Sequence, residues 1–228
     1  MEFLTGKTMA RREAGIAPVE WDVADSRVPY PQAVARMDAR QAAVHAGAAR
    51  ELVWLLEHPP LYTAGTSADP SELLSARLPV YESGRGGRYT YHGPGQRVGY
   101  VMLNLNERGR DIRCYVRALE DWVIVALSEL GIAARRAEGR IGIWCDDSQR
   151  REAKIGAIGV RVRKWVTAHG FSVNVDPNLT HFGGIVPCGI GEFPVTSMKA
   201  LGIDAGLTDL DAALKRHFES FLAAVGGR

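Results

Sequence analysis

The chain has 228 residues, of which 46% are hydrophobic and 24% charged, and its 28 basic side chains nearly balance 26 acidic ones. A chain of this length forms one large domain or two small ones, and the balanced charge argues against a nucleic-acid-binding surface. Because no apolar run is long enough to cross a bilayer or to act as a secretion signal, we expect a cytoplasmic protein that does not enter membranes.

The three cysteines, Cys114, Cys145 and Cys188, form no CxxC pair, and their odd number leaves one unpaired in any disulfide scheme. A zinc ribbon and a secreted disulfide scaffold are therefore both disfavoured. We expect three reduced thiols and no metal site. The remaining question is whether one of these thiols is reactive.

Residues 1–18 show no apolar period and are predicted to be a disordered extension ahead of a single domain over 19–228. Apolar residues at helical spacing predict a first helix with Pro31 in its first turn, although Gln41 interrupts the apolar face. The continuous apolar run 52–56 is followed by two prolines, and it predicts a strand buried on both faces.

Two further strands are predicted at 98–105 and 141–144. Between them lies the clearest helical pattern of the chain, in which apolar residues recur at i, i+3, i+4 and i+7. This helix is predicted to begin at Asp111 and to end at Gly131, because glycine is a common C-terminal cap.

From 155 to 175 the apolar period changes to two, which predicts a β-hairpin with its turn near Lys164. The last predicted helix begins at Thr208, which forms a variant capping box with Asp211, and it ends at Gly226. No repeat or linker divides the chain. The elements therefore predict one α/β domain of the α+β type, with a mixed sheet and flanking helices.

The segment 82–96 contains five glycines in fifteen positions. Glycine lets backbone amides approach a ligand closely, so such a loop can wall a pocket or bind an anion, although glycine-rich turns between strands are common. The spacing matches neither the phosphate-binding loop nor the dinucleotide fingerprint.

Two residues have settings that favour chemistry. Lys154 begins a strand-like run of small and apolar residues, where it is either a solvated strand-end lysine or a partly buried proton shuttle. Cys188 lies between Pro187 and Gly189 on a tight loop, where it is either an accessible thiol or a small buried hydrophobe. Cys114 and Cys145 have no comparable setting, and we interpret both as structural.

His92 and His169 each precede a glycine, and each is either a satisfied structural histidine or a polar group in a pocket. No His-x-x-x-His or His/Cys ligand spacing links them, so metal binding is disfavoured.

Four motifs occur in a fixed order: RGGRYTYHGPGQ at 85–96, KIGAIG at 154–159, HGFSVN at 169–174 and PCGI at 187–190. With EHPPLYTAG at 57–65, GIW at 142–144 and VTS at 195–197, the chain resembles the lipoyl(octanoyl) transferases from about residue 30 to 205. The resemblance implies the fold of the lipoate and biotin protein ligase catalytic domains.

The resemblance also implies a reaction. Members of this family take an octanoyl group from acyl carrier protein and give it to a lysine of the lipoyl domains of 2-oxoacid dehydrogenase complexes and similar acceptor proteins, with no cofactor. Cys188 is then the nucleophile that carries the acyl group, and Lys154 is its proton partner. A nearby ammonium would lower the pKa of the thiol and raise its thiolate fraction.

The resemblance further implies an acyl-binding set in three segments. Ser172 departs from the family pattern, in which a small residue such as alanine is frequent. The predicted acyl-binding residues are Arg85, Gly86, Gly87, Arg88, Tyr89, Thr90, Tyr91, His92, Ala157, Ile158, Gly159, Gly170, Phe171 and Ser172.

Two other functions stay open. An ATP-dependent lipoate ligase would use the glycine-rich loop for an adenylate and would not need Cys188. A cysteine hydrolase would pair the thiol with His92 or His169 as base and would not need Lys154.

Overall fold

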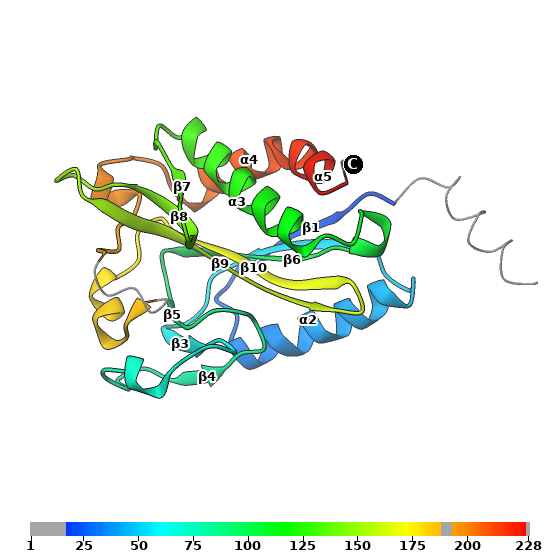
Figure 1. Ribbon diagram of the computed structural model, residues 1–228, viewed down its shortest axis with the longest axis horizontal. Helices are drawn as coiled ribbons and strands as arrows, with labels where there is room; N and C mark the ends of the chain where they lie inside the picture. The colour runs from blue at the N-terminus through cyan, green and yellow to red at the C-terminus, as the bar shows by residue number, and fades with distance from the viewer. Residues whose placement is uncertain (1–16, 188–192, 227–228) are drawn as a thin grey trace, which may run out of the picture.

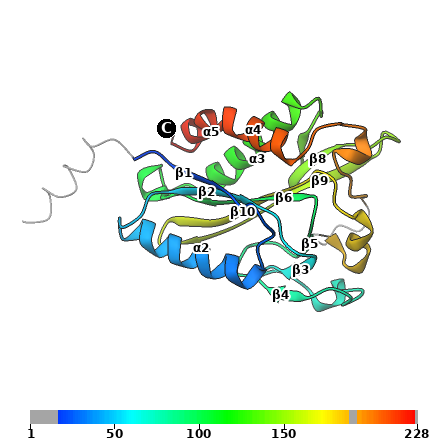
Figure 2. The same cartoon turned by 180° about the vertical axis from the view of Figure 1, so that it is seen from behind.

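The computed structural model describes residues 17–187 and 193–226. They form a mixed seven-stranded sheet in the order β1-β2-β6-β10-β9-β8-β7, beside a three-stranded sheet in the order β4-β3-β5. Helix α2 and the smaller sheet lie on one face of the larger sheet, and helices α3, α4 and α5 cover the other (Figure 1; Figure 2). The predicted fold class is confirmed.

The strands of the larger sheet are β1 (Glu20–Val23), β2 (Leu52–Leu56), β6 (Gln96–Met102), β7 (Arg135–Ala137), β8 (Arg140–Asp146), β9 (Glu152–Arg163) and β10 (Val166–Asn174). The strands of the smaller sheet are β3 (Leu61–Ala64), β4 (Val80–Glu82) and β5 (Tyr89–His92). The α-helices are α2 (Tyr30–His45), α3 (Ile112–Glu129), α4 (Leu207–Arg216) and α5 (Phe218–Gly226). Short 3₁₀ turns are η1 (Pro70–Glu72), η2 (Leu105–Glu107), η3 (Leu179–Gly184) and η5 (Lys199–Leu201).

The predicted elements on the N-terminal side are confirmed. Strand β2 is buried along its whole length, as its uninterrupted apolar sequence indicates. Gln41, the polar residue that interrupts the apolar face of α2, is buried as well. Its Nε2 is satisfied there by donating a hydrogen bond of 2.7 Å to the carbonyl oxygen of Val166. The interruption therefore ties α2 to β10.

The predicted limits of α3 and of the hairpin also hold. The Asp111 side chain accepts from the Cys114 amide (2.9 Å) at the start of α3, and Gly131 lies beyond its end with φ of 85°. Strands β9 and β10 are joined by Lys164 and Trp165 with φ of 49° and 64°, the left-handed pair that a two-residue hairpin turn requires.

The predicted last helix is wrong in two respects. It is two helices, since α4 ends at Arg216 and α5 begins at Phe218. The capping contact is made by the Gly206 amide, which donates to Asp209 Oδ2 at 2.8 Å, and not by Thr208 and Asp211. Asp211 instead accepts from Arg97 Nη2 on β6 at 2.8 Å, a tertiary contact that the local pattern cannot reveal.

Residues 1–16, most of the predicted extension, lie outside the described residues. Among the described helices, none combines the length and the apolar character that crossing a membrane requires.

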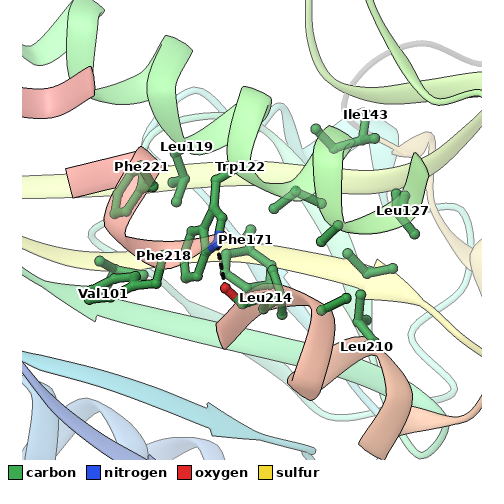
Figure 3. Close-up of a cluster of buried hydrophobic side chains, with 14 of the residues drawn as sticks. Val101, Leu119, Trp122, Leu127, Ile143, Phe171, Leu210, Leu214, Phe218 and Phe221 are labelled. Carbon is green, nitrogen blue, oxygen red and sulfur yellow. Dashed lines mark hydrogen bonds between the residues drawn. The ribbon is translucent and has the colours of Figure 1, made fainter. Parts of the chain in front are cut away.

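The largest apolar cluster fills the space between the sheet and helices α3, α4 and α5 (Figure 3). Trp122 of α3 lies at its centre, stacked on Phe221 with ring centroids 4.7 Å apart and edge-on to Phe171 of β10 at 5.5 Å. Its indole Nε1 donates to the Leu214 carbonyl oxygen at 2.8 Å. One side chain thus joins the sheet, the long helix and both C-terminal helices.

We expect Trp122→Ala to lower the free energy of unfolding by about 4 kcal/mol, because it leaves a large cavity in a packed core. Val125→Ala, one turn along the exposed side of α3, is the matched control and should change it by less than about 0.5 kcal/mol. Urea unfolding measures both. A loss below about 1 kcal/mol for Trp122→Ala would contradict the central place of this side chain.

Candidate active site

A cavity of about 410 Å³ opens between the larger sheet and the glycine-rich loop. Strands β9 and β10, strand β5, the loop before β5 and Tyr30 of α2 contribute to its walls. Its lining includes Lys154 and, of the residues predicted to bind the acyl group, Arg85, Gly86, Gly87, Arg88, Thr90, His92, Ala157, Ile158, Gly159, Gly170, Phe171 and Ser172. Segments distant in the sequence are thus brought together around one space.

Two residues of the predicted set depart from it. Tyr89 and Tyr91 do not line the cavity. They pack in a separate apolar cluster with Tyr62, Phe182 and Ile185. The cause is the alternation of side chains along β5, which directs Thr90 and His92 to one face and the two tyrosines to the other.

Glycines on the strands that wall the cavity let neighbouring segments approach closely. A Cβ on Gly170 would lie 2.3 Å from the carbonyl oxygen of Gly99, and a Cβ on Gly159 would lie 2.8 Å from Arg85 Cδ. Neighbouring strands and the glycine-rich loop therefore approach closely here. A larger residue at either position would displace backbone or the Arg85 stem.

Arg85 holds the glycine-rich loop in shape. Its guanidinium is buried and donates to the carbonyl oxygens of Thr63, Gly86 and Arg88 at 2.9–3.0 Å, and to Thr63 Oγ1 at 2.7 Å. These bonds tie the loop to β3, since Thr63 belongs to that strand. In this arrangement Arg85 shapes the wall of the cavity through its backbone contacts.

Lys154 lies near the start of β9 and is 7% exposed. Its amide donates to the Pro194 carbonyl oxygen and its own carbonyl accepts from Thr196, both at 2.9 Å. The side-chain Nζ donates to the carbonyl oxygen of Ile141 at 3.3 Å and lies 5.3 Å from the centroid of the Trp144 ring. Main chain and side chain are therefore both fixed by neighbouring strands.

Cys188 lies outside the described residues, as does the segment 188–192. Two described residues near that segment lie close to Lys154. Pro187 and Lys154 line the same small cavity of about 20 Å³, and Val195 forms a parallel bridge with Lys154.

His92 and His169 line the cavity, and His58 packs against His92 with ring centroids 5.7 Å apart. His58 bonds Tyr100 through Nε2 (2.7 Å) and Val28 through Nδ1 (2.6 Å), and His92 Nδ1 bonds Gln96 at 2.7 Å. His169 has φ of 60° within a strand, and its buried Nε2 has no hydrogen-bond partner among the described residues. The left-handed backbone turns this ring toward Tyr100, with the two rings edge-on at 5.7 Å.

Burial controls the charge of these rings. It lowers the pKa of His58 to about 4 and that of His169 to about 3, and it holds the pKa of His92 well below its ordinary value. All three are therefore neutral near pH 7. His58 was not predicted from the sequence, and its signal was the EHPP motif at 57–60.

The other two cysteines fit a structural role. Cys145 is buried, and burial raises the pKa of its thiol to about 11, so it stays protonated and unreactive. Cys114 Sγ donates to the Ala224 carbonyl oxygen at 3.5 Å. Within the described residues, no three histidine, cysteine or acidic side chains gather in a way that could hold a metal ion.

Comparison with known proteins places this chain in a family. Residues 29–219 match the family described as the lipoyl protein ligase A/B catalytic domain. The octanoyltransferase of Sphingopyxis alaskensis is 67% identical over 89% of this chain and 94% of its own, and that of Rhizorhabdus wittichii is 64% identical over 91% and 93%. The chain belongs to the octanoyltransferase family.

Solved structures support the fold. A bipartite lipoate protein ligase from Thermoplasma acidophilum has a TM-score of 0.67 and 18% identity, and the match covers 88% of this chain and 82% of that one. A biotin protein ligase from Aquifex aeolicus has a TM-score of 0.54 and 13% identity, covering 93% and 73%. The octanoyltransferase chain therefore has the fold of these ligase catalytic domains.

We expect His169 to make stability depend on pH. The unfolded chain takes up a proton on this residue near pH 6.5, whereas the folded state resists it until about pH 3. The contribution of His169 to the free energy of unfolding is thus fully present above pH 6.5. It decreases as pH falls toward 3, by about 1.4 kcal/mol per pH unit.

His169→Asn tests this, because asparagine tolerates the left-handed backbone and does not titrate in this range. Urea unfolding from pH 7 to 5 should give a shallower loss of stability for the variant. Parallel stability curves for the two proteins would show that His169 does not carry this dependence.

Proposed function

We propose that this octanoyltransferase moves an octanoyl group from acyl carrier protein to a lysine of lipoyl domains, through a thioester on Cys188. The observation that supports it best is the position of Lys154, which lies at the wall of the larger cavity and also shares the small cavity with Pro187. An acyl chain in the larger cavity would place its carbonyl carbon beside both the amine and the chain that carries Cys188.

In the first half-reaction Lys154 is the proton partner of Cys188 and takes up the proton of its thiol. The sulfur attacks the carbonyl carbon of the octanoyl thioester, and the carrier thiolate leaves and receives the proton back from Lys154. One thioester is exchanged for another, so the step needs no ATP.

In the second half-reaction the acceptor lysine attacks the octanoyl-Cys188 thioester through its neutral amine. Lys154 takes the proton that the attacking nitrogen loses and returns it to the departing sulfur of Cys188. An amide forms, the thioester breaks and the enzyme is regenerated. One thiol and one amine thus serve both halves of a double displacement.

The larger cavity suits a medium acyl chain. A volume of about 410 Å³ lies within the range of ordinary ligand pockets. Each methylene that leaves water for such a wall contributes about 0.8 kcal/mol, so eight carbons favour octanoyl over much shorter chains.

The arrangement disfavours a cysteine hydrolase with a histidine base. His92 and His169 line the larger cavity, whereas the described lining of the small cavity beside Pro187 includes Lys154 and no histidine. The neutral imidazoles are available as hydrogen-bonding groups. Lys154 is the basic residue among the described lining of that small cavity.

The proposed partners are octanoyl-acyl carrier protein as donor and the lipoyl domains of 2-oxoacid dehydrogenase complexes as acceptors. The cytoplasm is the proposed compartment, because a thiol nucleophile must stay reduced.

We expect the protein to gain the mass of one octanoyl group when it is incubated with octanoyl-acyl carrier protein and no ATP. The adduct should be released by hydroxylamine, and Cys188→Ala should not form it, because the thioester needs the thiol. Cys145→Ala is the matched control and should acylate normally. Intact-protein mass spectrometry measures all three. Normal transfer by Cys188→Ala, or an absolute need for ATP, would overturn the proposal.

Lys154→Met keeps the apolar stem and removes the amine, and it should slow single-turnover acylation of Cys188 by about 10²- to 10⁴-fold. His169→Asn removes the candidate hydrolase base and should change this rate by much less. The two rates, measured by rapid quench, distinguish the mechanisms. If the acylation rate of His169→Asn fell by the larger factor while that of Lys154→Met stayed unchanged, the base would be the histidine.

A further inference from the structure

A buried carboxylate that the mechanism above does not use lies on α3. Glu120 is 6% exposed, and its Oε1 accepts a hydrogen bond of 3.1 Å from the amide of Gly142 in β8. Its Oε2 lies 3.5 Å from Nε of Arg136 in β7. Burial raises the pKa of Glu120, while the bond from Gly142 and the charge of Arg136 act in the opposite direction.

The amide that Glu120 accepts from belongs to the peptide group between Ile141 and Gly142. The carbonyl oxygen of that same peptide group accepts from Nζ of Lys154 at 3.3 Å. A carboxylate on one end of a peptide group polarises it and strengthens its carbonyl as an acceptor. Glu120 is thus linked to the Lys154 amine through a single rigid plane.

Gly142 is suited to this arrangement in two ways. Its φ of 130° is a conformation that other residues rarely adopt, and a Cβ there would lie 2.7 Å from Cε and 3.0 Å from Nζ of Lys154. The lysine stem therefore lies against bare backbone. The peptide group must keep one orientation for its carbonyl to reach Nζ, and the Glu120 bond fixes that orientation from the other side.

We propose that Glu120 is a positioning residue, which holds the peptide group between Ile141 and Gly142 so that its carbonyl orients the Lys154 amine for proton transfer. The carbonyl oxygen of Ile141 can only accept, so it engages one N–H of Lys154. The other positions on the nitrogen then face away from Ile141 and serve proton transfer. The proposal rests on the proposed function, because it gives the orientation of Lys154 a purpose.

A structural role for the same contacts is the alternative. Glu120 satisfies a buried amide and faces Arg136, so it also ties α3 to the hairpin of β7 and β8. Loss of activity in one variant would not distinguish the two roles. A double-mutant cycle does, because a residue that acts through Lys154 has nothing to act on when the amine is gone.

The test measures single-turnover octanoylation of Cys188 in Glu120→Ala, Glu120→Gln and the control Asp121→Ala. Asp121 pairs with Arg136 but is exposed and does not contact Gly142. Glu120→Ala should lower the rate roughly tenfold with an unchanged KM for the acyl carrier protein. Glu120→Gln keeps an acceptor for Gly142 and should recover most of the rate, and Asp121→Ala should leave it unchanged.

The decisive experiment repeats Glu120→Ala in the Lys154→Met background, where it should lower the single-turnover rate by less than twofold. An equal cost in both backgrounds, or equal rates for Glu120→Gln and Glu120→Ala, would overturn the positioning role while leaving the proposed function intact. If Lys154→Met alone transferred at the original rate, the lysine mechanism and this inference would both be overturned. Circular dichroism establishes whether each variant is folded. If Glu120→Ala is unfolded, Glu120→Gln takes its place in the comparison of the two backgrounds.

Discussion

The hydrogen bonds that fix Lys154 in β9 are the interactions on which the arrangement of the site depends. Three segments meet there, because the main chain of Lys154 pairs with 194–196 while its side chain reaches the carbonyl of Ile141 in β8. Lys154 itself is buried, so each lost partner would leave one of its polar groups unsatisfied. The amine is thus fixed before any substrate arrives.

A second constraint is the close approach of the elements around the cavity. Glycines on β9 and β10 let the strands, the glycine-rich loop and its Arg85 clamp lie close together, and Lys154 lines the cavity that they border. Phe171 of β10 packs against Trp122 in the large apolar core and also lines the cavity. The core and the cavity therefore meet at this strand.

Much of this architecture is predictable from local sequence. The apolar run of β2, the amphipathic pattern of α3 and the turn at Lys164 are set by neighbours in the chain, and all were found at the expected places. Most residues that the motifs predict to bind the acyl group line the cavity, whereas Tyr89 and Tyr91 face away from it. A motif read as a continuous stretch does not show that alternate residues of a strand face opposite sides.

What sequence reasoning missed depends on tertiary contacts. Asp211 is used by Arg97 of a distant strand and not by its own helix, and a single apolar pattern does not show the break between α4 and α5. The burial of His58 against Tyr100 and the link from Glu120 through Gly142 involve partners that no local pattern joins.

The most direct measurement is a crystal structure of the octanoyl-enzyme. We predict that Lys154 Nζ lies within about 3.5 Å of the Cys188 sulfur, with the octanoyl chain in the larger cavity. A lysine directed away from the sulfur, or a chain bound elsewhere, would contradict the account.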